Sequence, residues 1–284
     1  MSRRSMPSAD ALDATIPDRI ARGSPTTYRS VLGMRVDASS YTHAATLMAA
    51  WADRGRSRYV CVASVNNVMQ AYDRSTFMQV MNGADLVVPD GRPLVWALRA
   101  FGVGDASQVR GTYLTEALLR MAWERDLTVG VLGASPEVLS AFRREVDRSW
   151  PGLRLVYAFS PPFRQLSPEE DSSIVRDIRA SRARILLVAL GCPKQEMWMW
   201  RHREAIPSVM VGVGAAIDFL AGYKRQAPVI VQRSGLEWLF RLASEPRRLW
   251  RRYLSQNPRF VVLLATEVAR FRAGRRLPGA ARAR

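Results

Sequence analysis

The chain has 284 residues, of which 48% are hydrophobic, and it carries a formal net charge of +17 at pH 7. This length and apolar content allow one large domain, or one domain with an appendage. Only two cysteines and two histidines are present, which excludes a disulfide framework and argues against a metal site built from those residues. The positive charge favours an anionic partner, such as nucleic acid, acidic lipid or a phosphorylated substrate.

The first 30 residues are rich in Ser, Pro, Asp and Arg, and we expect them to form a loosely ordered lead-in. They lack the apolar core of a secretory signal peptide, so no such signal is expected. No window of about 18 apolar residues is free of charge, so no transmembrane helix is expected either.

Residues 31–222 alternate between short apolar runs and segments with helical spacing. Strands are expected at 59–63, 86–88, 128–132, 153–158, 185–190 and 209–213. Helices are expected at 41–53, 92–101, 113–125, 136–148, 168–181 and 193–205. Most of the strands are apolar throughout, which is typical of strands covered on both faces. The pattern predicts an α/β catalytic domain with an open, mostly parallel, Rossmann-like sheet and helices on both faces.

After residue 222 the alternation stops, and residues 223–284 carry 15 Lys and Arg against 3 Asp and Glu. We expect a basic helical appendage here, with Pro246 and Pro258 separating helices at 232–243, 246–254 and 258–272. Four apolar residues of the last helix recur at helical spacing: Val261, Leu264, Val268 and Phe271. A basic amphipathic helix of this kind indicates binding to an anionic membrane surface. The alternative is that this apolar stripe of four residues packs on the main domain.

Ligands of open parallel sheets bind beyond the carboxyl ends of the strands, so the turns after the predicted strands are where chemistry is expected. Asp90 lies in Pro89-Asp90-Gly91, directly after one strand, where its carboxylate can remove a proton from an attacking hydroxyl. The alternative is that Asp90 caps the helix expected at 92–101, since Asp is a favoured N-cap residue.

Two further turns carry small and polar residues. Ser64 and Asn66 follow the strand at 59–63 and suit sugar hydroxyls or phosphate, although helix capping explains them equally well. Gly133-Ala134-Ser135 suits a diphosphate at a helix N-terminus, yet the turn lacks the full G-x-G-x-x-G pattern. The competing interpretation is an ordinary turn with Ser135 as N-cap and Pro136 at the first helical position.

A third turn begins at Gly191 and places Lys194, Gln195 and Glu196 in the first turn of a helix. Glu196 suits the positive end of the helix dipole, whereas Lys194 is unfavourable there unless an anion binds. Gln195 offers a donor and an acceptor to a base or to a sugar edge. The position of Lys194 therefore favours an anionic ligand at this turn.

No Asp-x-Asp sequence occurs in the chain, so we expect no divalent metal on a nucleotide-sugar diphosphate. Positive groups of the protein would then have to neutralise a departing diphosphate. The candidates are Arg110, Arg241, Arg248, Arg251 and Arg252. For any single arginine, a solvated surface charge is the alternative.

Seven stretches, in this order, resemble the WecG/TagA/CpsF family of glycosyltransferases. They are SVNNVMQAY, ADLVVPDGRPLVWALR, VRGTYL, VGVLGASPE, LLVALGCPKQEMW, VGVGAAIDFLAGYKRQAP and GLEWLFRLASEPRRLWRRY, within residues 31–254. The resemblance implies transfer of a sugar from a UDP-sugar to a polyprenyl-diphosphate-linked saccharide, with inversion of the anomeric centre. It implies a peripheral protein at the cytoplasmic face of the bacterial inner membrane, acting in exopolysaccharide or other surface polysaccharide synthesis.

The resemblance implies no cofactor beyond the UDP-sugar donor and no nucleic-acid partner. Relatives use N-acetylmannosamine, its uronic acid, glucose and other donors, so the sugar, the acceptor saccharide and the pathway stay open. The oligomeric state stays open as well, a homo-oligomer included.

By position, Asp90 resembles the family's general base, and Ser64, Arg110 and Gln195 match positions implicated in activity. Ser64 stands where a threonine is common and keeps its hydroxyl, whereas Ala134 stands where a second glycine is frequent. The candidate substrate-binding residues are Asn66, Gly133, Ala134, Ser135, Gly191, Lys194, Glu196, Gly214, Asp218, Arg241, Arg248 and Arg252.

Two other functions remain open on the sequence. A nucleotide-binding oxidoreductase would use a similar fold, and the missing G-x-G-x-x-G pattern weighs against it. The net charge is the only support for a nucleic-acid-binding protein, since no helix-turn-helix, zinc-finger or RNA-binding aromatic motif is recognisable.

Overall fold

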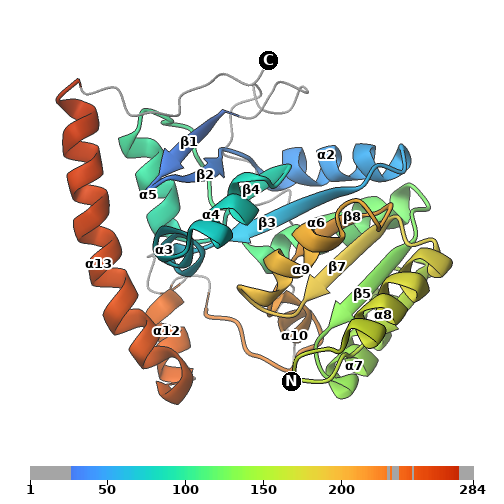
Figure 1. Cartoon of the computed structure of the whole chain (residues 1–284). Coiled ribbons are helices and arrows are strands. Elements are labelled where there is room, and N and C mark those ends of the chain that lie inside the picture. Colours follow the sequence, from blue (N-terminus) through green and yellow to red (C-terminus); the bar gives the residue numbers. More distant parts are fainter. Residues whose placement is uncertain (1–26, 229–230, 232–236, 245, 275–284) are drawn as a thin grey trace.

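A computed structural model of the chain describes residues 27–228, 231, 237–244 and 246–274. Its centre is a sheet of parallel strands in the order β4-β3-β8-β7-β5-β6 (Figure 1). The strands are β3 (Arg58–Ala63), β4 (Leu86–Pro89), β5 (Val129–Gly133), β6 (Leu155–Phe159), β7 (Ile185–Ala189) and β8 (Val209–Gly212). All six predicted strands are therefore confirmed, with ends that shift by no more than two residues.

Side chains of one strand alternate between two hydrophobic clusters, because successive residues of a strand point to opposite faces. In β7, Ile185 and Leu187 lie in one cluster, whereas Leu186 and Val188 lie in the other. Buried strands that serve two cores need apolar residues at every position, which explains the continuous apolar runs.

Helices cover both faces of the sheet, as the alternating pattern predicts. One face packs against α2 (Tyr41–Asp53), α6 (Gly111–Glu124), α7 (Pro136–Ser149) and α10 (Ala216–Leu220). The other packs against α3 (Val65–Asp73), α4 (Ser75–Asn82), α8 (Pro168–Ser181) and α9 (Lys194–His202). The helix α5 (Arg92–Ala100) follows β4 and contributes to the second cluster.

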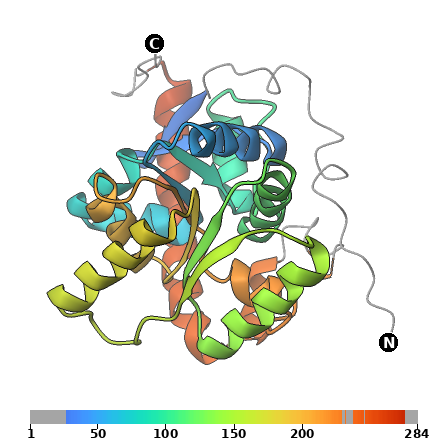
Figure 2. The same ribbon diagram turned by 90° about the vertical axis from the view of Figure 1, so that its right-hand side faces the viewer.

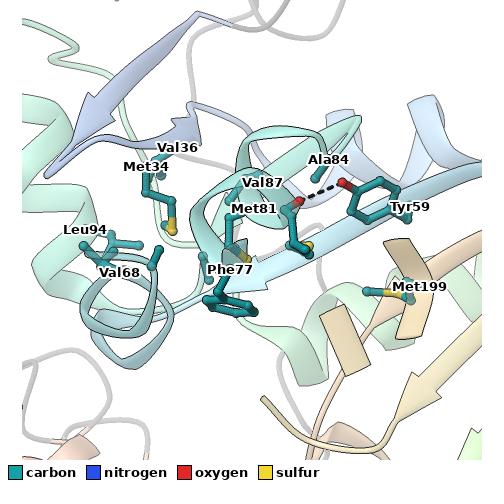
Figure 3. Packing of buried hydrophobic residues seen from close by; sticks show 14 of the residues in the cluster. Met34, Val36, Tyr59, Val68, Phe77, Met81, Ala84, Val87, Leu94 and Met199 are labelled. Carbon is teal, nitrogen blue, oxygen red and sulfur yellow. Dashed lines mark hydrogen bonds between the residues drawn. The ribbon is translucent and has the colours of Figure 1, made fainter. Parts of the chain in front are cut away.

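An antiparallel hairpin of β1 (Tyr28–Val31) and β2 (Met34–Asp37) precedes the parallel sheet, and the sequence analysis missed it. Regular structure thus begins at Tyr28, inside the segment expected to be loosely ordered, while residues 1–26 lie outside the described residues. Figure 3 shows Met34 and Val36 of the hairpin packed near Phe77 and Met81 of α4. The hairpin therefore extends the hydrophobic core on the α3–α4 side.

The C-terminal helices differ from the prediction at Pro258. The structure has α12 (Glu237–Ser244) and one continuous helix, α13 (Pro246–Arg272), which contains Pro258. Proline removes one backbone hydrogen bond, to the carbonyl of Leu254, a residue that is 66% exposed. The predicted helix break at Pro258 is therefore wrong, and residues 232–236 of the first predicted helix lie outside the described residues.

Helix α13 is fixed along the side of the domain, against α3 and α5 (Figure 1), and lies behind the sheet in Figure 2. Phe260 is fully buried, and Arg259 forms an ion pair with Asp73 of α3 at 2.6 Å. The predicted apolar stripe divides: Leu264 and Val268 pack on the core, whereas Val261 is 62% exposed. None of the helices in the described ranges combines the length and apolarity needed to cross a bilayer.

Candidate active site

A cleft of about 1320 Å³ opens at the carboxyl ends of β3, β4, β5, β7 and β8. All predicted site residues whose side chains the structure describes line this cleft, although they come from turns far apart in the sequence. They are Ser64, Asn66, Asp90, Arg110, Gly133, Ala134, Ser135, Gly191, Lys194, Gln195, Glu196, Gly214 and Asp218. Arg241 lies on α12 and Arg248 and Arg252 lie on α13, but their side chains are outside the described residues.

Asp90 directly follows β4, and its backbone N–H donates to the carbonyl of Ala63, which extends the pairing with β3. Its carboxylate Oδ1 accepts a hydrogen bond of 2.9 Å from the backbone N–H of Gly111, the first residue of α6. The N-cap of α5 is Gly91, with no side-chain capping bond. The alternative in which Asp90 caps that helix is therefore wrong, because the carboxylate lies at the N-terminus of α6, across the turn.

Arg110 precedes α6 and lies beside aromatic residues. Its backbone N–H donates to the Tyr41 hydroxyl at 3.0 Å, and its guanidinium lies 6.0 Å from the ring centroid of Tyr113. Burial and the positive charges of Arg110 and Arg99 lower the pKa of Arg92. The guanidinium groups of Arg92 and Arg110 are thus close enough to repel each other. Arg92, the first residue of α5, was not a predicted site residue, and it is not among the residues that line the cleft.

Ser64 serves as the N-cap of α3, so its capping interpretation is confirmed. Its backbone N–H and its hydroxyl both donate to Oδ1 of Asn67, at 3.1 and 3.0 Å. The amide of Asn66 donates to Cys192 Sγ at 3.2 Å. Both predicted residues line the cleft while they also hold the local turn.

The turn after β5 requires its small residues. Gly133 has φ +113°, and a Cβ there would lie 2.6 Å from the backbone of Ala189 on the neighbouring strand β7. Ala134 adopts φ 62° and Ser135 caps α7 by accepting from the N–H of Val138 at 3.4 Å. The ordinary capped turn is therefore present, and it exposes the N-terminus of α7 to the cleft.

Lys194 and Gln195, in the turn after β7, are adjacent in the sequence, but their side chains lie in different environments. Lys194 is exposed in the cleft wall and forms no ion pair within the described ranges. Gln195 is buried, and its Oε1 accepts from the backbone N–H groups of Gly191 and Gly214, at 3.2 and 3.1 Å. Only Lys194 of this pair is presented to an anionic ligand.

Glu196 is fully buried beneath the cleft. Its Oε1 accepts from the side-chain amides of Asn67 and Gln195, both at 3.0 Å. Burial raises the pKa of the Glu196 carboxyl, and these amide donors oppose the shift only in part. The neutral acid is therefore favoured relative to an exposed glutamate. Asn67 and Cys192, which the sequence analysis did not select, complete this cluster.

The segment after α10 brings further charge to the cleft. Asp218 lies in α10, and its carboxylate is 3.9 Å from Nζ of Lys224. Lys224 and Arg225, the first basic residues of the predicted appendage, line the cleft together with Phe240 of α12. Within the described ranges, no three His, Cys, Asp or Glu side chains converge in a way that could hold a metal ion.

Comparison with protein families gives one match that covers most of the chain. The model of the "Glycosyl transferase WecG/TagA/CpsF family" matches residues 29–274. The match includes the hairpin apart from Tyr28, the whole parallel sheet and the C-terminal helices α12 and α13. Every residue placed in the cleft thus lies inside the matched region.

Proposed function

Because the chain belongs to the WecG/TagA/CpsF glycosyl transferase family, whose members act in cell-surface polysaccharide synthesis, we propose that it transfers a sugar from a UDP-sugar to a polyprenyl-diphosphate-linked saccharide. The observation that carries this proposal is the convergence of Asp90, Arg110 and Lys194 on one cleft. Its volume of about 1320 Å³ exceeds the roughly 300–1,000 Å³ of a typical small-molecule site. The cleft therefore has room for the donor and the reacting end of an acceptor together.

Asp90 acts as the general base in this proposal. Its carboxylate removes the proton from the acceptor hydroxyl while that oxygen attacks the anomeric carbon of the donor. The new C–O bond forms on the face opposite the diphosphate, and the bond between the anomeric carbon and the UDP oxygen breaks. The sugar is transferred with inversion, and UDP leaves with the bonding electron pair.

The departing diphosphate needs positive groups at a fixed distance. Arg110, Lys194 and Arg225 line the cleft and supply charge, and the N-terminus of α7 supplies backbone N–H groups. Arg241, Arg248 and Arg252 follow in the basic segment and are proposed to add to this charge. No metal ion is required in this scheme, since the chain has no Asp-x-Asp sequence.

Contact with the membrane is assigned to the C-terminal basic segment, which would place the protein peripherally at the cytoplasmic face of the inner membrane. Helix α13 exposes Trp250, Leu254, Val261 and Val262, and it also exposes the basic side chains of Arg247, Arg270 and Arg272. A helix with exposed apolar and basic residues binds anionic lipid surfaces through both kinds of contact. The acceptor lipid would then be within reach of the cleft.

A screen for UDP release tests the proposed function. The purified chain is incubated with each of several UDP-sugars, with and without membrane extract that contains lipid-linked saccharides, and with and without a metal chelator. We expect one donor to release UDP only when the extract is present, and to do so in the chelator as well. Absence of release with every donor, combined with steeply salt-dependent nucleic-acid binding, would support the nucleic-acid alternative instead.

A further inference from the structure

Three strand-end turns of the cleft are joined through one buried carboxyl oxygen. Oε1 of Glu196 accepts from the amide of Asn67 on one side and from the amide of Gln195 on the other. Asn67 and Glu196 are 129 residues apart in the sequence. The link therefore exists only in the folded chain.

Each amide continues the connection to a different turn. Asn67 accepts from the backbone and the hydroxyl of Ser64, in the turn after β3. Gln195 accepts from the N–H of Gly191 after β7 and from the N–H of Gly214 after β8. These three turns present Ser64, Lys194 and the backbone of Gly214 to the cleft.

The arrangement is costly for stability alone. Glu196 is 0% exposed, and in the part of the chain that the structure describes no amide or hydroxyl group donates to its second oxygen, Oε2, while the Cys192 thiol beside the carboxyl is only a weak donor. A buried polar group that lacks strong hydrogen bonds lowers the stability of the fold, and replacing such a cluster as a whole by apolar residues of similar size is often neutral or stabilising. Such a cost is retained where the geometry serves a function.

We propose that Glu196 and Asn67 are positioning residues, which hold the three turns in the register that the nucleotide-sugar requires. This inference rests on the proposed function. It also assigns Gln195 an indirect role, because both polar atoms of its amide are bonded within the protein. Misplacement of a reacting group by about 1 Å can reduce the rate by about a hundredfold, so loss of the link should affect turnover more than folding.

Two substitutions at Glu196 separate positioning from stability. Glu196→Gln keeps an oxygen that accepts from both amides, whereas Glu196→Leu keeps the volume and removes the acceptor. We expect Glu196→Gln to retain turnover within about threefold. Glu196→Leu should lower kcat/KM by about 10- to 100-fold under conditions in which it is still folded, and should lower the unfolding midpoint because the buried amides of Asn67 and Gln195 lose their acceptor. The matched control is Ser208→Ala, which removes a buried hydroxyl that bonds Ala183 just before β8, at the opposite end of the sheet.

Amide hydrogen exchange at Gly191 and Gly214 gives a readout that does not depend on activity. In Glu196→Leu both amides should exchange about tenfold faster, because Gln195 loses the acceptor that orients it, while Ser208→Ala should leave them unchanged. Full turnover in Glu196→Leu, or unchanged exchange at both glycines, would overturn the proposal. If the wild-type protein turned over no UDP-sugar, the proposed function would fail, and the exchange rates would still decide whether Glu196 holds the turns.

Discussion

The carboxylate of Asp90 accepts a hydrogen bond from the backbone N–H of Gly111 at 2.9 Å, and this contact joins the end of β4 to the start of α6. The bond orients the carboxylate within the cleft, and the helix N-terminus favours its negative charge. Arg110 immediately precedes Gly111, so the proposed base and a cation for the diphosphate are fixed by the same helix start.

Arg110→Ala should weaken the reaction without unfolding the protein. A hydrogen bond to a charged group contributes about 1.5–3 kcal/mol, so kcat/KM for the UDP-sugar should fall by about 10- to 100-fold. The kcat/KM of Arg110→Lys should lie between those of the wild type and Arg110→Ala, because lysine keeps the positive charge but not the planar guanidinium. Steady-state kinetics measure this effect, with Arg125→Ala at the opposite end of α6 as the control. Equal losses in both alanine variants would contradict a specific role for Arg110.

The raised pKa of Glu196 predicts a pH-dependent difference in stability between the wild type and Glu196→Gln. Both side chains are neutral below the ordinary glutamate pKa of 4.5, so the difference there is constant. As the pH rises above 4.5, ionisation favours the unfolded wild type until the higher folded-state pKa is reached. The free energy of unfolding should then fall relative to Glu196→Gln by about 1.4 kcal/mol per pH unit.

Urea unfolding of both proteins between pH 4 and pH 8 measures this difference. Glu204→Gln is the matched control, because the Glu204 side chain is 86% exposed and its substitution should give a flat difference. A flat difference for Glu196→Gln as well would show that burial does not shift this carboxyl.

Cys192 should report occupancy of the cleft. The chain has two cysteines, of which Cys61 is fully buried and Cys192 lines the cleft. An alkylating reagent should therefore label the native protein once, at Cys192. UDP at ten times its Kd should slow this labelling about tenfold, as measured by mass spectrometry of the intact chain. Labelling that is unchanged by saturating UDP would place the nucleotide elsewhere.

The anchoring of α13 should depend on Phe260. Phe260→Ala removes a fully buried ring and should lower the free energy of unfolding by about 3–5 kcal/mol. Val261→Ala, at the next and 62% exposed position, should change it by no more than about 0.5 kcal/mol. Denaturant unfolding compares the two. Similar values for both would mean that the helix does not contribute to the folded core.

The sequence predicts the parallel sheet well because each strand serves two cores and is apolar throughout. The hairpin of β1 and β2 has no continuous apolar run by which it could be predicted, since each strand has four residues and carries charged side chains, as in Met34–Asp37. The continuous helix across Pro258 was missed for another reason. Local sequence marks proline as a break, whereas packing of Phe260 and Leu264 stabilises the helix beyond it.

The candidate cleft could be predicted in position but not in detail. Strand-end turns identify Asp90 and Lys194, because parallel strands end at one edge. One partner of Gln195, Gly214, comes from a different turn, 19 residues away, and the bond between Asn67 and Glu196 spans 129 residues. Only the folded chain shows that Gln195 is bonded internally while Lys194 remains in the cleft wall.

The most direct test of the proposed mechanism is the turnover of Asp90→Asn with saturating UDP-sugar and lipid-linked acceptor. Asparagine keeps an oxygen that can accept from Gly111, but it loses the negative charge and the ability to take a proton. We predict a fall in kcat of about 10²–10⁴-fold, with the Kd for UDP unchanged. Asp105→Asn, at an exposed position before α6, should be as active as the wild type. Near-full turnover by Asp90→Asn would contradict the assignment of Asp90 as the general base.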